Sequence, residues 1–249
     1  MRLAVNGGGA YAAPVAETTP PAIDAVELPA AHAVVVEHLR RAIHLGHYPV
    51  GTKLPPERTL ATQLGISRVT LREAIRVLED EGLIRTRRGA TGGAFVLMPA
   101  LSPEELRAHV RGRRDELLAV LEFRLVNERL AARMAAERVT PQDVADLEAT
   151  VEALRTSTGI GPFRQADSAF HLKVASMAAS ALIESAVADA RAAMFLPLDV
   201  LDFDIMHDSA VRGHEKVLAA IRDGDGDRAS RAMASHIRTT TRELEAVLG

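Results

Sequence analysis

Residues 54–96 constrain the fold more than any other segment, because their order of helix, tight turn, helix and glycine-rich hairpin admits few arrangements. Pro55 and Pro56 open the first helix, since proline is tolerated in a first helical turn. Gly65 supplies the left-handed residue that ends this helix and lets the chain reverse. Ser67 caps the helix that follows. The segment therefore predicts a helix-turn-helix with a wing, which places one helix in a DNA major groove.

The second predicted helix carries an apolar face and a basic face. An apolar stripe at helical spacing packs inward, and arginines recur every four residues on another side. The stripe consists of Leu71, Ile75 and Leu78, and the arginines are Arg68, Arg72 and Arg76. A recognition helix needs both faces, because one side packs against its domain while the other meets phosphates and base edges.

The basic face has a second interpretation, a solvated surface partly paired with Glu73, Glu79 and Asp80. The hairpin that follows decides between the two. Its basic residues and glycines are Arg85, Arg87, Arg88, Gly89, Gly92 and Gly93. A basic hairpin directly after a basic helix favours contact with DNA over a face that is merely exposed.

The same segment resembles the N-terminal winged helix-turn-helix of GntR-type bacterial transcription regulators. The resemblance starts near Ala31 and runs through the hairpin. The residues that match the pattern of that family are Gly51, Leu54, Pro55, Pro56, Glu57, Arg58, Leu60, Ala61, Gly65, Ser67, Arg68, Thr70, Arg72, Glu73, Ala74, Gly82 and Leu83.

The resemblance implies which side chains meet DNA. Three arginines would make the main contacts, a serine and a threonine would bind phosphate or bases, and the hairpin tip would enter the minor groove. The three arginines are Arg58, Arg68 and Arg72. The serine and the threonine are Ser67 and Thr70, and the hairpin tip consists of Arg88 and Gly89. The partner would be double-stranded DNA, and a homodimer of such readers would bind a palindromic operator.

The composition excludes several classes of protein. The 249-residue chain has no cysteine, so it forms neither a disulfide framework nor a zinc–thiolate site, and nothing argues against a reducing cytoplasm. No apolar run reaches the roughly eighteen residues of a membrane helix. The Gly-, Ala-, Pro- and Thr-rich segment 1–30 lacks the basic start and apolar core of a signal peptide. We interpret it as a disordered arm.

Charge divides the rest of the chain into two parts. Residues 31–98 carry 10 basic and 6 acidic side chains, a net charge of +4, whereas residues 101–249 carry 19 and 24, a net charge of −5. The whole chain is at −3, which alone would not indicate a nucleic-acid binder. A basic unit joined to an acidic one indicates a DNA-binding domain at 31–98 and a ligand-sensing and dimerisation domain at 101–249.

Residues from Leu101 onward predict helices throughout. Ser102 and Pro103 start the first, with acidic residues in its first turn. Further helices are expected near 115–138, from Thr140 onward, and near 162–178, 181–195, 208–222 and 226–247. Since this part shows no strand-like alternation, we expect an all-α antiparallel helical bundle. The fold class is therefore mostly α, with a small β-hairpin only in the wing.

One aspartate and three histidines form a candidate metal site. Asp167 and His171 stand four residues apart, on one helix face. His214 and His236 lie on two further predicted helices. Such a set suits a borderline divalent ion such as zinc, nickel or manganese, although the spacing alone is common on helices. The other histidines are interpreted as surface or packing residues: His32, His38, His44, His47, His109 and His207.

This half of the chain resembles the all-helical FCD effector domain of the FadR-like branch of the GntR family. The resemblance implies that the four side chains bind a metal, zinc first among the candidates, and that a small organic acid completes the coordination. It also implies that Arg124 pairs with the carboxylate of that effector, which a guanidinium can hold with two hydrogen bonds. The matching residues are Glu122, Phe123, Arg124, Glu128, Asp167, His171, His214, Gly224, Asp225 and His236.

Two features depart from the expected pattern. Many relatives have an Asn-Pro-like pair after the first histidine, where this chain has Ala179 and Ser180. Gly213 precedes His214 inside a predicted helix, at a cost of about 1 kcal/mol relative to alanine. The sequence leaves open whether this glycine relieves crowding at the site.

The sequence thus predicts a dimeric, metal-dependent transcription regulator that responds to a small carboxylate, with a repressor preferred, and not an enzyme. A hinge is expected near Leu97–Ala100. Two alternatives stay open: the same regulator sensing an acyl-coenzyme A without a metal, and a metal with a purely structural role. A metal-dependent hydrolase is weaker, because no general base or nucleophile motif stands beside the ligands.

Overall fold

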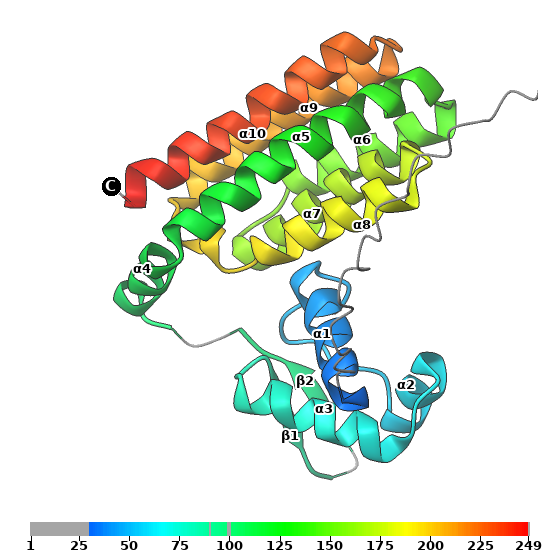
Figure 1. Cartoon of the computed structure of the whole chain (residues 1–249), viewed down its shortest axis with the longest axis vertical. Helices are drawn as coiled ribbons and strands as arrows, with labels where there is room; N and C mark the ends of the chain where they lie inside the picture. The colour runs from blue at the N-terminus through cyan, green and yellow to red at the C-terminus, as the bar shows by residue number, and fades with distance from the viewer. Residues whose placement is uncertain (1–29, 90, 99–100, 249) are drawn as a thin grey trace, which may run out of the picture.

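The described residues form two units, a small winged helix and a larger helical bundle (Figure 1). The computed structural model describes residues 30–89, 91–98 and 101–248. The predicted arm, apart from Ala30, lies outside this part, as do Pro99 and Ala100 of the predicted hinge. The described structure is mostly helical, with one two-stranded sheet, and this confirms the predicted fold class.

The winged helix is built around the inward stripe of its third helix. Its antiparallel hairpin pairs Ile84 with Val96 and Arg87 with Gly93. The buried residues that meet in its core include Leu39, Ile43, Leu71, Leu78, Ile84 and Val96. Its elements are α1 (Ala31–His44), α2 (Glu57–Leu64), α3 (Arg68–Asp80), β1 (Ile84–Arg87) and β2 (Gly93–Val96).

The turn between α2 and α3 forms for the reasons that the sequence suggests. Gly65 ends α2 in the left-handed conformation, at φ 66°. The Oγ of Ser67 accepts a hydrogen bond from the backbone N–H of Thr70 at 3.0 Å and so caps α3. One detail differs: α2 begins at Glu57, so Pro56 is its N-cap and the prolines precede the first turn.

The bundle is centred on its longest helix, which packs against four others. This helix is α5 (Arg114–Arg138), and its partners are α7 (Ile160–Met177), α8 (Ala181–Ala193), α9 (Phe203–Arg222) and α10 (Gly226–Leu248). The remaining elements are α4 (Pro103–Gly112), α6 (Pro141–Arg155) and the short 3-10 helix η1 (Pro197–Val200). Small residues on α5 bring its neighbours close, and those fully buried there are Ala131, Ala132, Ala135 and Ala136.

Side-chain caps set the helix boundaries of the bundle. Ser102 with Glu105 and Thr140 with Asp143 form capping boxes at α4 and α6. The carboxylate of Asp202 accepts two backbone hydrogen bonds at 3.1 Å, so α9 begins about five residues before the predicted start at 208. Within the described residues, none of the helices combines the length and apolarity of a membrane span.

The two units touch where α1 meets the C-terminal end of α8 (Figure 1). The His44 ring stacks on Phe195, with centroids 4.4 Å apart and planes 8° apart. The guanidinium of Arg164 lies 4.3 Å from the centroid of the same phenylalanine. Arg41 pairs with Asp189 at 2.7 Å. His44 is therefore a packing residue, as predicted, and its packing joins the two units.

Candidate functional site

The arginines expected to bind DNA lie exposed on the winged helix. Arg58, Arg68 and Arg72 are all exposed, on α2 and α3. Ser67 and Thr70 lie at the start of α3, where their hydroxyls are 2.9 Å apart. Figure 1 shows α2, α3 and the hairpin on the side of this unit that faces away from the bundle. The surface is thus accessible to a long, rigid partner such as a duplex.

A single carboxylate organises two of these arginines. Glu57 Oε2 lies 2.8 Å from Arg72 Nε and 3.7 Å from Arg68 Nη2. All three side chains are substantially exposed, at 37%, 52% and 57% for Glu57, Arg72 and Arg68. An exposed pair of this kind is worth little, about 0–1 kcal/mol, so a phosphate can replace the carboxylate at small cost.

The wing places further basic groups beside α3. Gly92 N–H donates to the Gly89 carbonyl at 2.9 Å and closes the hairpin tip. Gly89 has φ 106°, a conformation that favours glycine. Arg88 at the tip is exposed, whereas Arg87 lies over the Phe95 ring at 5.0 Å. The arrangement leaves Arg88 free to reach a groove; Ala90 lies outside the described residues.

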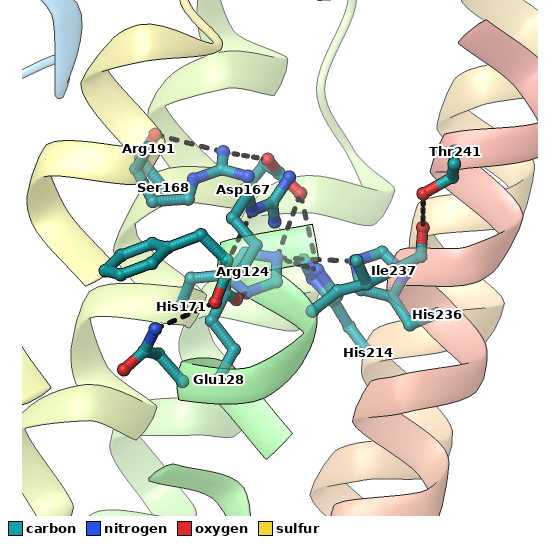
Figure 2. Close-up of polar contacts among 12 residues, drawn as sticks. Arg124, Glu128, Asp167, Ser168, His171, Arg191, His214, His236, Ile237 and Thr241 are labelled. Atoms are coloured by element: carbon teal, nitrogen blue, oxygen red, sulfur yellow. Dashed lines mark hydrogen bonds and ion pairs between the residues drawn. The ribbon is translucent and has the colours of Figure 1, made fainter. Parts of the chain in front are cut away.

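In the bundle, the four predicted metal ligands come together (Figure 2). Asp167 and His171 extend from α7, His214 from α9 and His236 from α10. One ligand atom from each lies within 4.8 Å of all the others, and all four residues are buried. Residues far apart in the sequence therefore form one compact donor set.

The separations of these atoms match a metal coordination shell. His171 Nε2 lies 3.2 Å from His214 Nε2 and 3.3 Å from His236 Nε2. Asp167 Oδ1 lies 3.3 Å from His214 Nε2 and 3.8 Å from His171 Nε2. Nitrogens bound to one zinc at about 2.0–2.1 Å in a tetrahedron stand roughly 3.3–3.4 Å apart. The residues present fit a small divalent cation.

The protonation states also fit a cation. Burial lowers the pKa of His171 to about 4, and burial together with the neighbouring imidazoles lowers the pKa of His236 well below its usual value. Burial alone would raise the pKa of Asp167, but Arg191 and the imidazoles hold it well below its ordinary value. Neutral imidazoles and an ionised carboxylate are the forms that bind metal.

Two further buried residues support the ligands. Glu128 contacts Nδ1 of His171, which orients the ring with its Nε2 lone pair toward the other imidazoles. Arg191 pairs with Oδ2 of Asp167 and donates to Ser168 at 3.3 Å, leaving Oδ1 toward the histidines (Figure 2). No role for Arg191 is predicted from the sequence, where it is a lone arginine in an alanine-rich helix.

Arg124, the predicted effector anchor, lies beside this cluster with only 1% of its surface exposed. Its Nε donates to Glu128 Oε1 at 2.6 Å. Its Nη1 is buried and has no hydrogen-bond partner among the described residues. Although burial would raise the pKa of Glu128, Arg124 and His171 hold it below its ordinary value. Arg124 therefore uses Nε for the pair with Glu128 and keeps Nη1 as a donor for a ligand.

The glycine before His214 makes room for another ligand. A Cβ on Gly213 would clash with the His236 ring, lying 2.9 Å from its Cγ. Alanine would therefore have to push this imidazole away from its neighbours. Gly213 relieves crowding at the site, which answers the question that the sequence left open.

Comparison with known proteins assigns the family. The description "Bacterial regulatory proteins, gntR family" matches residues 32–96, and "FCD domain" matches residues 119–239. An Escherichia coli K12 protein assigned to regulation of the L-lactate dehydrogenase operon is 32% identical over 221 residues, which cover 82% of each chain. The chain belongs to the GntR family of bacterial regulators. It is a DNA-binding transcription regulator of that family with an FCD effector domain.

Two other proteins match this chain over most of its length. The galactonate operon transcriptional repressor of E. coli K12 is 29% identical over 224 residues, covering 86% of this chain and 96% of the repressor. The structure of E. coli McbR/YncC has the same fold, with a TM-score of 0.55 and 19% identity over 89% of this chain and 100% of its own. The relatives are transcription regulators and not enzymes, so the hydrolase alternative has no support.

Proposed function

We propose that this GntR-family regulator is a cytoplasmic, homodimeric repressor whose DNA affinity depends on a metal and a small carboxylate. Residues 31–98 would bind DNA, and residues 101–249 would bind the ligands and the second subunit. The observation that carries the proposal is the convergence of three imidazole nitrogens and one carboxylate oxygen in a buried cluster. Without a cation these atoms satisfy one another only in part, because each pair of Nε2 atoms at 3.2–3.3 Å needs one protonated ring, and a buried polar atom without a partner is costly.

The donor set favours zinc, with nickel and manganese as alternatives. Imidazole and carboxylate suit all three ions, and a tetrahedral shell of this size is typical of zinc. His171, His214, His236 and Asp167 would hold the ion. When bound, it would act as a Lewis acid that attracts the carboxylate of the effector.

Arg124 would hold the same carboxylate through its free Nη1. The cavity next to it has a volume of about 20 Å³ and is lined by both polar and apolar residues. A volume this small holds neither an acyl chain nor a small organic acid as it stands, so binding of either one requires neighbouring side chains to move. Lactate and galactonate, named in the descriptions of two relatives, are the first effectors to test.

A chain of contacts connects the cluster with the winged helix. Arg191 binds the ligand Asp167 and lies on α8, one turn before Phe195. Phe195 in turn stacks on His44 of α1. A change in the partner of Asp167 would therefore act on the end of α8 that supports the winged helix. This contact would have two arrangements, one that favours DNA binding and one that does not. The effector would shift DNA affinity only by the difference between its own affinities for the two.

The second subunit would cover an apolar stripe on α5. Phe123, Val126 and Leu130 are spaced by three and four residues, and their exposed fractions are 47%, 64% and 45%. Three exposed apolar side chains on one helix face are typical of a protein interface. A two-fold dimer would then bind a palindromic operator.

The test uses DNA selected by the full-length protein from a random duplex library. Fluorescence anisotropy then measures affinity for the selected duplex with chelated protein, with zinc, and with zinc plus lactate or galactonate. We expect the acid to change affinity at least about fivefold, and only when zinc is present. Bound metal without any response to acids would make the metal structural; a response without metal would contradict the proposed site.

A further inference from the structure

The exposed side of α3 carries an apolar side chain to which the predicted DNA contacts give no role. Val69 lies in the first turn of this helix, and 65% of its surface is exposed. Among the described residues of the winged helix, no other large apolar side chain is as exposed. Valine also has a lower helix propensity than alanine, because its side chain is branched at Cβ. Neither packing in the core nor helix formation therefore accounts for this residue.

Val69 lies on the side of α3 that faces away from the core of its domain. At 3.6 residues per turn, it stands about 160° around the helix from Leu71, which is fully buried. Arg72 and Arg76 follow Val69 at intervals of three and four residues, so the three side chains share one face. Both arginines are exposed. Val69 is therefore an apolar residue within the basic face of the helix.

The arginines closest to Val69 in the sequence leave it uncovered. Arg68 Nη2 and Arg72 Nε lie 3.7 and 2.8 Å from the same oxygen of Glu57, at the start of α2. Both guanidiniums are therefore turned toward α2 and not across Val69, in agreement with its exposed fraction. The valine presents two methyl groups that are held in place, because a β-branched side chain has one strongly preferred rotamer in a helix.

The major groove offers one partner for such a side chain. A valine side chain has no hydrogen-bond donor or acceptor, and among the base edges in this groove only thymine presents a methyl group. We propose that Val69 recognises a thymine of the bound DNA by contact with the C5 methyl of that base. The contact removes apolar surface from water on both partners and orders little that is flexible.

The position of Val69 separates this interpretation from a valine that is merely exposed. Single apolar residues are common on protein surfaces and need no partner. Here the neighbours on both sides along the chain, Arg68 and Thr70, are predicted DNA contacts, and Arg72 follows one turn later. The inference uses the DNA-binding activity of the family and is independent of any ligand in the bundle.

Thr70 carries the other methyl group near the start of α3. Its side chain is only partly exposed, and its hydroxyl lies 2.9 Å from Ser67 Oγ at the helix cap. Thr70 is therefore tied to the capped first turn, whereas Val69 has no such contact and stands in solvent. We assign the thymine contact to Val69, and the experiment distinguishes the two residues.

The experiment uses full-length protein and a duplex that it selects from a random library. Each thymine of this duplex is replaced in turn by uracil, which lacks only the C5 methyl, and fluorescence anisotropy measures the affinity. We expect uracil at one position at least to weaken binding of the native protein about threefold to fivefold, the value of one buried methyl group. In Val69→Ala, the same replacement should weaken binding less than about 1.5-fold. Alanine favours helices, so this variant should fold.

Two variants serve as matched controls. Val34→Ala removes an exposed valine of α1, and Thr70→Ser removes the other methyl group but keeps the hydroxyl. Both should show the loss that uracil causes in the native protein.

A loss that persists in Val69→Ala, or that disappears in Thr70→Ser instead, overturns the inference. A native protein for which no thymine responds to uracil also overturns it. These results leave the DNA binding of the protein intact. If the full-length protein selects no duplex, the inference and the DNA binding fail together.

Discussion

Arg68 and Arg72 on α3 keep 57% and 52% of their side chains exposed, whereas Arg124 and Arg191 in the bundle keep 1% and 4%. The exposed pair shares one half-exposed carboxylate, Glu57, at 3.7 and 2.8 Å. Each buried guanidinium has a buried carboxylate of its own. The same residue type is therefore held loosely in one domain and tightly in the other.

The difference follows from what each environment does to a charge. In water an ion pair contributes little, so an exposed arginine exchanges its carboxylate for a phosphate almost without cost. In the interior an unpaired charge costs several kcal/mol, so a buried arginine keeps its partner until another ion takes its place. The exposed arginines are therefore suited to reversible binding of phosphate, whereas the buried arginines stay paired with their carboxylates.

The largest effect is expected when a buried ion pair is broken. Arg191→Met leaves Asp167 buried without its guanidinium, and metal-free protein should lose about 3–5 kcal/mol of unfolding free energy. Zinc should recover part of this loss, because the cation then neutralises the carboxylate. Urea unfolding with and without zinc measures both values. The control is Arg238→Met, at an exposed position on α10, which should change the unfolding free energy little. An equally small loss for Arg191→Met would contradict the difference between exposed and buried arginines.

The opposite result is expected for an exposed arginine. Arg72→Ala should weaken binding to the selected duplex by about 1–3 kcal/mol if it contacts a base. Its unfolding free energy should change by less than about 0.5 kcal/mol, because the lost ion pair is exposed. Arg107→Ala, exposed on α4, should affect neither quantity. A large loss of stability in Arg72→Ala would mean that this exposed arginine also stabilises the fold of the winged helix.

An intermediate effect concerns the contact between the two domains. Burial lowers the pKa of His44 to about 4, so between pH 6.5 and 4 the unfolded chain binds a proton that the folded protein does not. Stability from this residue is therefore complete above pH 6.5 and falls as pH decreases, by up to about 1.4 kcal/mol per pH unit.

His44→Phe tests this contact because it keeps a ring on Phe195 but removes the titration. The difference in unfolding free energy between the native protein and this variant should change with that slope from pH 6.5 toward 4. Urea unfolding at four or five pH values measures it. A difference in unfolding free energy that is independent of pH would show that His44 binds a proton as readily in the folded protein as in the unfolded chain.

The smallest expected effect concerns Glu57, the exposed carboxylate that Arg68 and Arg72 share. Glu57→Gln removes the carboxylate that competes with phosphate for Arg68 and Arg72. DNA affinity should rise by less than about 1 kcal/mol, because the competing pair is exposed. Anisotropy with the selected duplex measures the gain, and Glu73→Gln, at an exposed position of α3, is the control. Weaker binding would show that Glu57 holds the arginines in place for DNA.

The sequence predicts the local parts of this molecule better than its long-range contacts. Gly65 and Ser67 predict the turn of the winged helix because their effects are confined to neighbouring residues. α9 begins before its predicted start, because in the sequence Asp202 cannot be told from any other loop aspartate. Asp167 and His171 share a helix face, so half of the cluster is visible in the spacing alone.

Arg191 could not be found in this way. It meets Asp167 across 24 residues and two helices. Nothing in its neighbouring sequence marks it. A buried ion pair is defined by its partner, and that partner becomes known only when the bundle is assembled.

The central claim is that the imidazole and carboxylate cluster holds a metal, and elemental analysis tests it most directly. The protein is purified without added metal or chelator, together with His236→Ala, which removes a ligand without leaving an unpaired charge. His109→Ala, an exposed histidine on α4, is the control. We predict about one divalent metal per chain in the native protein and the control, and none in His236→Ala. A native protein without metal, or equal metal in all three, would contradict the claim.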